Sequence, residues 1–274
     1  MKIAVIGLPR TATTVTCELL ANKYQLEDRN YMIPVLYNIV RNSPHTQTIK
    51  DQKQFVKTFN KGVFDQLFKR DNFVVKYASS MWFSDIEWDR FDKIVFCSRA
   101  NQMDLVKSMV YVREYHPPTP EESWFTRMSR QAQTLLEQNF QDLQSYSTDQ
   151  DWEELVTRYW TLYQTFPKNL KSQSINVDEV KIKTFLQSLK LNLKDFEDLR
   201  QTIQSQSANC CDVTYEMWHQ DPTTAAAQLS SALGVNVDSQ DLGSLTNQPD
   251  GIDYNNCITN SSQIEQLWQS ISID

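Results

Sequence analysis

The last quarter of the sequence lacks positive charge. All 27 lysines and arginines lie in residues 1–200, whereas residues 201–274 contain none and carry nine acids. The whole chain of 274 residues has a formal charge of −7, which argues against a basic surface for nucleic acid. Cations that bind an anionic ligand must therefore come from the first 200 residues.

Other absences narrow the class of protein. No apolar run reaches the roughly 18 residues of a membrane-spanning helix, and the chain opens in a short apolar run that is unlike a signal peptide. The five cysteines show no metal-ligand spacing, and Cys17 and Cys97 lie in apolar runs, as buried reduced thiols do. We predict a soluble cytoplasmic protein, without a metal, whose residues 1–274 form a single domain.

Glycine is scarce, and the first one follows an apolar run. Gly7 is the sole glycine before Gly62. The β-branched run 3–6 predicts a strand, Gly7 and Pro9 end it, and a helical pattern begins near Thr13. A strand, a tight loop and a helix N-terminus form an anion cradle, because first-turn N–H groups and the helix dipole favour negative charge. An ordinary turn between strand and helix is the simpler alternative.

Further apolar runs predict a sheet. Long segments separate these runs, which favours crossover connections and parallel strands covered on both faces. We expect an α/β fold of three layers, α/β/α, with a central, mostly parallel sheet of about five strands. The chain from 24 to 28 is a short strand or its exit, and residues 110–205 are expected to form a helical insertion. Four strands should lie side by side with their carboxyl ends at one cleft: 2–6, 72–77, 93–97 and 210–214.

The loop after the first strand resembles a known anion-binding motif. It reads Gly-Leu-Pro-Arg-Thr-Ala-Thr-Thr over residues 7–14. It departs from the nucleotide P-loop G-x-x-x-x-G-K-[ST], because Ala12 and Thr13 replace its second glycine and its lysine. It is similar to G-x-P-[KR]-[ST]-G-T-T, the 5′-phosphosulfate loop of sulfotransferases that use 3′-phosphoadenosine 5′-phosphosulfate (PAPS). The resemblance implies a fold like that of P-loop nucleotide kinases and sulfotransferases, with cofactor contacts from Pro9, Arg10, Thr11, Ala12, Thr13 and Thr14.

A second segment, 98–108, resembles the sulfotransferase motif R-N-P-x-D-x-x-x-S. The spacing from Asp104 to Ser108 is kept, but one extra residue follows Arg99 and the proline is absent. The resemblance implies that Arg99 and Ser108 bind the 3′-phosphate, and an arginine can hold a phosphate through two parallel hydrogen bonds. Arg99 paired with a local carboxylate such as Asp104 is the alternative.

A third segment, 211–222, is similar to V-x-Y-E-D-L-x-x-D-P of the same family. The resemblance implies that Tyr215 lies near the bound nucleotide. Asp221 followed by Pro222 also predicts a helix start, with the carboxylate at the N-cap and proline at the first helical position.

The chain also departs from the family. Many members read K-T-H where this chain has Lys76-Tyr77-Ala78, so the strand-end cation is kept and the histidine is lost. Members without that histidine often use a glutamate shortly after the first helix, a place that Glu27 roughly occupies beside Asp28; a surface acid is the simpler explanation. A basic loop near the C-terminus, common in the family, has no counterpart here.

The resemblance implies transfer of a sulfuryl group from PAPS to a hydroxyl acceptor, a small molecule or glycan, with release of 3′-phosphoadenosine 5′-phosphate (PAP). Arg10 and Lys76 would stabilise the leaving group, and Glu27 would take the acceptor proton. One alternative is an ATP-dependent P-loop kinase, which needs a lysine at position 13 and an aspartate at a strand end. The other is a nucleotide-binding protein of the same fold without catalysis.

Overall fold

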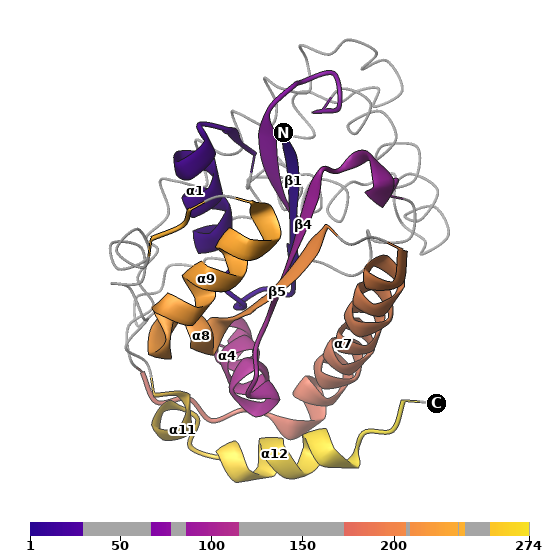
Figure 1. The fold of residues 1–274 in the computed structure, drawn as a ribbon. Helices are drawn as coiled ribbons and strands as arrows, with labels where there is room; N and C mark the ends of the chain where they lie inside the picture. The colour runs from indigo at the N-terminus through magenta and orange to yellow at the C-terminus, as the bar shows by residue number, and fades with distance from the viewer. Residues whose placement is uncertain are drawn as a thin grey trace, which may run out of the picture.

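A five-stranded sheet forms the centre of the computed structural model, which describes residues 1–29, 67–77, 86–114, 173–206, 209–234, 236–238 and 253–273 (Figure 1). The strands lie in the order β2-β3-β1-β4-β5, and every pairing in this described part is parallel. Their bounds are β1 Lys2–Gly7, β2 Glu27–Arg29, β3 Phe73–Tyr77, β4 Lys93–Ser98 and β5 Cys210–Thr214. The predicted α/β fold is confirmed, and the four strands expected to be neighbours are β3, β1, β4 and β5.

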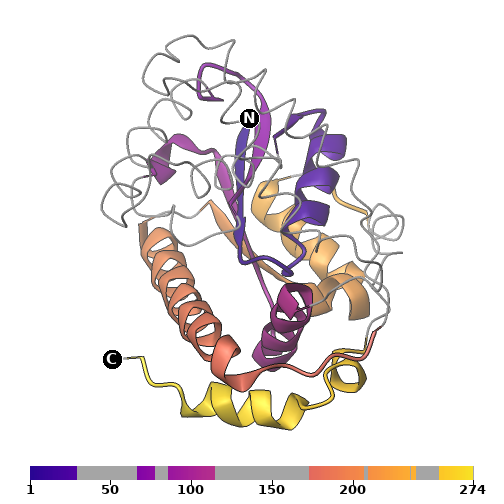
Figure 2. The ribbon, with the colours of Figure 1, turned by 180° about the vertical axis from the view of Figure 1, so that it is seen from behind.

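Helices lie on both sides of this sheet (Figures 1 and 2). On one side are α1 (Thr13–Tyr24), α8 (Tyr215–Gln220) and α9 (Pro222–Leu233), which share an apolar cluster with β1 and β4. On the other side is α7 (Glu179–Gln206), where the Phe196 ring lies 6.1 Å from that of Phe96 on β4. Between α7 and α8 lies α4 (Gln102–Glu114), with α11 (Tyr254–Cys257) and α12 (Ser261–Ser270) outside it. A short 3-10 helix, η2 (Trp88–Arg90), precedes β4.

The ends of α9 follow the expected capping chemistry. The Asp221 carboxylate accepts a hydrogen bond from the Thr224 N–H at 3.0 Å, and Pro222 occupies the first turn. Gly234 ends the helix with φ of 72°, a left-handed conformation that glycine adopts without strain. The helix start predicted from Asp221 and Pro222 is confirmed.

The strand registers bring the carboxyl ends together at one edge. Gly7 on β1 lies opposite Cys97 on β4, and Ile6 lies opposite Tyr77 on β3. Ser98 and Thr214 pair at the ends of β4 and β5. The loop after β1 therefore lies between the ends of its two neighbours, where open parallel sheets place their ligand sites.

Some predictions reach beyond the described residues. Of the helical insertion expected over 110–205, the structure describes the end of α4 and the segment from 173 that includes α7. Ala78 also lies outside the described residues. Within the described ranges, no helix has both the length and the apolar character required to cross a membrane.

Candidate functional site

Gly7 lets the loop turn tightly against β4. A Cβ atom at this position would lie 2.4 Å from the carbonyl oxygen of Cys97 and 2.6 Å from Oγ1 of Thr11. The Thr11 hydroxyl donates a hydrogen bond of 2.6 Å to the carbonyl oxygen of Leu8, which closes the loop on itself. Glycine is required here by the close approach of neighbouring atoms.

Two residues of this loop have left-handed backbone conformations although neither is glycine. Arg10 has φ of 71°, and Ala12 has φ of 65°. Such a conformation costs an L-residue roughly 1–2 kcal/mol, and strain of this kind gathers at functional sites. Ala12 is the N-cap of α1, yet an alanine side chain has no oxygen with which to cap a helix. The first-turn N–H groups, which have no intrahelical partner, are the donors that such a loop offers to an anion.

Lys76 extends from the end of β3 to the first turn of α1. Its ε-amino group donates a hydrogen bond of 2.8 Å to Oγ1 of Thr14. Desolvation lowers the pKa of Lys76, and interaction with Cys17, Asp28 and Glu18 partly offsets that decrease. The structure thus brings together a partly buried lysine and a loop threonine that the sequence placed in one site.

Arg10 points to the other side of the site, toward α4 and α11. Its Nε donates to Oγ of Ser108 at 2.9 Å, and its Nη2 donates to the hydroxyl of Tyr254 at 2.6 Å. Ser108 is fully buried on α4. Sequence reasoning paired Ser108 with Arg99, whereas the structure pairs it with Arg10.

Arg99 is held at the start of α4. Its guanidinium lies 4.1 Å from the ring centre of Tyr215, and its Nη1 donates to the main-chain carbonyl of Asp104 at 3.3 Å. Its side chain is only 9% exposed, and Nε lies 3.9 Å from a carboxylate oxygen of Glu216. Among the described residues this Nε has no hydrogen-bond partner. The Glu216 carboxylate also accepts the N–H groups of 100–101, at 2.9 and 3.2 Å, and so fixes the turn that carries Arg99.

The two arginines share a helix. Arg99 contacts α4 at Asp104 and Arg10 contacts it at Ser108, one helical turn further on. Both guanidinium groups therefore lie at the carboxyl end of the sheet, as the predicted site requires.

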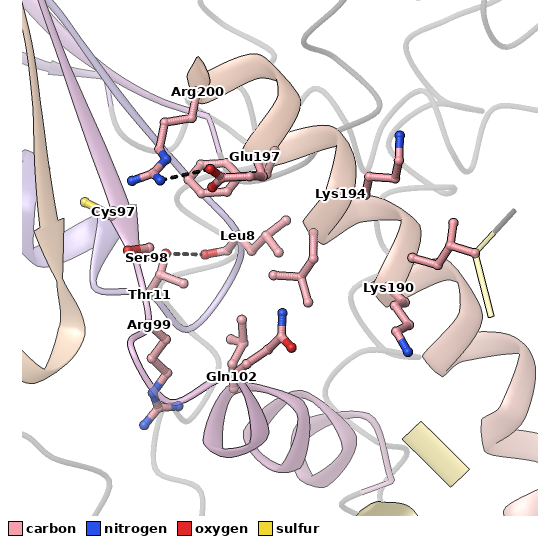
Figure 3. Close-up of a pocket in the computed structure, with 14 residues that line it drawn as sticks. Leu8, Thr11, Cys97, Ser98, Arg99, Gln102, Lys190, Lys194, Glu197 and Arg200 are labelled. Atoms are coloured by element: carbon pink, nitrogen blue, oxygen red, sulfur yellow. Dashed lines mark hydrogen bonds and ion pairs between the residues drawn. The ribbon is translucent and has the colours of Figure 1, made fainter. Parts of the chain in front are cut away.

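A pocket of about 410 Å³ opens beside the loop (Figure 3). Leu8 and Thr11 line it from the loop, and Arg99 lines it from the end of β4. Its opposite wall is α7, whose apolar residues alternate with Lys190, Lys194 and Arg200. Those cations belong to no motif. Only the spacing of the wall residues 190, 193, 194, 197 and 200 along the helix could have placed them on one face.

The structure places Glu27, the predicted catalytic base, on the edge strand β2. Glu27 lies opposite Phe73, at the amino end of β3, whereas the loop follows the carboxyl end of β1. Its carboxylate is about half exposed and lies 2.6 Å from Nη1 of Arg70. The neighbouring Asp28 is the acid of this strand whose charge acts on Lys76.

Comparison with protein-family models and with curated proteins finds no match for this chain. The site therefore has to be interpreted from its own geometry. Sequence reasoning missed Tyr254 completely, because it lies 244 residues from Arg10 and belongs to no motif.

Proposed function

We propose that this protein is a sulfotransferase that moves a sulfuryl group from PAPS to a hydroxyl of a small molecule or glycan. The observation that supports it is the convergence of three cations at one end of the sheet. Lys76 contacts the first turn of α1, Arg10 contacts Ser108 on α4, and Arg99 contacts Asp104, one turn away on the same helix. A ligand with two separated anionic groups matches this arrangement.

The residues present fit such a donor. The uncapped N-terminus of α1 and the Lys76 amine offer N–H groups to a phosphosulfate. Arg99, nearly buried and with Nε unsatisfied among the described residues, offers a donor to a second anion beside the Tyr215 ring. Glycine at position 7 lets the loop turn tightly against β4, which keeps the loop at the carboxyl end of the sheet.

The chemistry of sulfuryl transfer needs positioning and charge stabilisation, as phosphoryl transfer does. Lys76 and the N–H groups of 11–14 stabilise the negative charge that develops on the leaving 5′-phosphate. A carboxylate of β2, either Glu27 as the sequence predicts or Asp28 beside it, accepts the proton of the acceptor hydroxyl.

Calorimetry with PAP, AMP and ATP·Mg²⁺ tests the proposal. PAP should bind without Mg²⁺ and at least about 10-fold more tightly than AMP, since a charge-assisted hydrogen bond is worth roughly 1.5–3 kcal/mol. Arg99→Ala should remove much of that preference and leave the affinity for AMP nearly unchanged.

Two outcomes would contradict the proposal. If ATP·Mg²⁺ binds best, the protein is a kinase, although β3 ends in Lys76-Tyr77 and β4 runs into Ser98-Arg99 where a kinase needs an aspartate. If PAP binds tightly but PAPS is not turned over with a broad panel of hydroxyl acceptors, the protein is a binding protein of the same fold.

A further inference from the structure

The pocket beside the loop includes the C-terminal segment in its wall. Lys190 on α7 donates hydrogen bonds to the main-chain carbonyls of Trp268 and Ile271, at 3.0 and 2.7 Å. Its amine also lies 5.1 Å from the ring centre of Trp268. These contacts hold the segment that follows α12 against α7, and Ile273 of that segment lines the same pocket as Leu193 of α7.

Much of the lining of this pocket is apolar. Leu193 and Ile273 are half-buried, so part of each side chain stays accessible. Leu8, Leu105 and Phe196 line it as well, and each is at most 5% exposed. A volume of about 410 Å³ lies in the range of small-molecule sites, which combine an apolar lining with a few polar groups. A lining of this kind favours a ligand with an apolar body.

The cations of the α7 wall are already engaged with protein groups. Lys194 lies 3.0 Å from a carboxylate oxygen of Asp198, and its amine points away from the pocket (Figure 3). Arg200 lies 2.9 Å from a carboxylate oxygen of Glu197. The Lys190 amine donates to main-chain carbonyls near the C-terminus. This wall therefore does not require an anionic ligand, although it contains three cations.

Two polar side chains of the pocket have hydrogen-bonding groups to offer. Ser98 ends β4 beside the loop, and Gln102 begins α4 with its amide directed into the space between the loop and α7 (Figure 3). Within the described part of the chain, neither side chain makes a hydrogen bond. A serine hydroxyl and a glutamine amide each contain a donor and an acceptor, which is what an uncharged hydroxyl group needs.

We propose that this pocket is the acceptor site and that it takes an uncharged alcohol with an apolar body, not a glycan. Ser98 and Gln102 bind the hydroxyl beside the loop, while Leu193 and Ile273 contact the apolar body. A sugar would bring several hydroxyls against apolar side chains, where they lose their hydrogen bonds to water. This inference rests on the proposed function and narrows the class of acceptor that it leaves open.

Titrations with 1-butanol, 1-hexanol, 1-octanol and glucose, followed by saturation-transfer NMR, test the class of ligand. The dissociation constant should fall about 4-fold for each CH₂ group added to the alcohol, the value of a buried methylene. Glucose should not bind at the same concentrations. PAP should not displace 1-octanol, because donor and acceptor occupy the site together during a transfer between them. With PAPS, 1-octanol should be sulfated with a higher kcat/KM than glucose.

Leu193→Gln and Leu191→Gln form a matched pair of variants on α7. Leu191 is 48% exposed and does not line this pocket. Leu193→Gln should weaken the binding of 1-octanol by about 5-fold, since it removes part of the apolar lining. Its affinity for PAP should stay within about 2-fold of wild type. Leu191→Gln should keep both wild-type affinities.

A second pair lies in the segment after α12 and tests the same wall if the α7 variants fold poorly. Ile273→Asp should weaken the binding of 1-octanol by about 5-fold. Ser272→Asp, at an exposed neighbouring position, should leave it unchanged.

The outcomes separate this inference from the proposed function. If PAP displaces 1-octanol, the pocket belongs to the nucleotide site, so the inference is overturned and the proposed function stands. Equal affinity for the three alcohols, equal losses in the two members of a pair, or faster sulfation of glucose than of 1-octanol also overturns it. If the alcohols bind as expected but wild type shows no preference for PAP over AMP, the proposed function itself fails.

Discussion

Replacing Ala12 with glycine should make this protein more stable, although glycine usually weakens a helix. Ala12 has φ of 65° and ψ of 16°, and it is the N-cap of α1. This left-handed conformation costs an alanine roughly 1–2 kcal/mol and costs glycine nothing. Ala12→Gly therefore removes strain from the folded state without disturbing the direction of the loop.

Two opposing effects reduce the gain. Glycine makes the unfolded chain more flexible, which costs about 0.5–1 kcal/mol. Removal of a half-buried methyl group costs about 0.4 kcal/mol, half the value of a fully buried one. The net expectation is an increase of about 0.5 kcal/mol in the free energy of unfolding, in line with the preference of N-cap positions for glycine over alanine.

Urea denaturation of Ala12→Gly beside Ala227→Gly checks this reasoning. Ala227 is exposed within α9, where the same substitution should destabilise the protein by about 1 kcal/mol. The two variants should thus differ by about 1.5 kcal/mol, with opposite signs relative to wild type. If both lose the same stability, Ala12 is not strained and the loop conformation described here is wrong.

Two other perturbations test the surroundings of the loop. Gly7→Ala should destabilise the protein by about 1–3 kcal/mol in urea denaturation, because the new methyl group meets the main-chain oxygen of Cys97 at 2.4 Å; an unchanged midpoint would contradict that contact. Lys76→Met should raise the free energy of unfolding at pH 7 and abolish PAPS turnover. Desolvation lowers the pKa of Lys76 in the folded state below its ordinary value of 10.5. Between the lowered pKa and 10.5 the unfolded state therefore binds more protons than the folded state, so the free energy of unfolding of the wild type rises with pH in that range. The advantage of Lys76→Met should therefore shrink as the pH approaches 10.5, and an advantage that is constant with pH would refute the burial of a charged lysine.

The strands could be predicted because each buried strand appears in the sequence as a short continuous run of apolar residues. The apolar run 3–6 and the run that contains Phe73, Val74 and Val75 are fully buried, as strands covered on both faces must be. The tight turn at Gly7 could also be predicted, because glycine is the residue that most easily lets a strand end in a sharp turn. Element bounds shifted by a residue, with β3 starting at Phe73 and β4 continuing to Ser98.

The position of Glu27 follows from the topology of the sheet. In a parallel sheet the helix after one strand returns the chain to the amino edge, where the next strand begins. Glu27 begins β2 directly after α1, so it lies opposite Phe73, the first residue of β3. The sequence indicated a short strand or its exit at residues 24–28, and the structure shows that Glu27 begins that strand.

The hydrogen bond between Ser108 and Arg10 could not be predicted from neighbouring residues in the sequence. Asp104 and Ser108 both lie on α4, and Arg99 contacts the main-chain carbonyl of Asp104, not its carboxylate. Arg10 contacts Ser108 because of the direction in which its side chain leaves the loop. That direction follows from the positive φ of Arg10, a conformation that sequence patterns predict for glycine and not for arginine.

The uneven distribution of charge along the chain matches the ion pairs between its C-terminal quarter and the first 200 residues. Acids of the C-terminal quarter contact cations of the first 200 residues: Glu216 meets Arg99, Glu265 meets Lys107, and Asp212 meets Arg200. A basic tail would repel the surface on which α11 and α12 pack, whereas an acidic one is attracted to it. The segment that lacks lysine and arginine thus contacts cations supplied by other elements, and at Arg10 it does so with the hydroxyl of Tyr254.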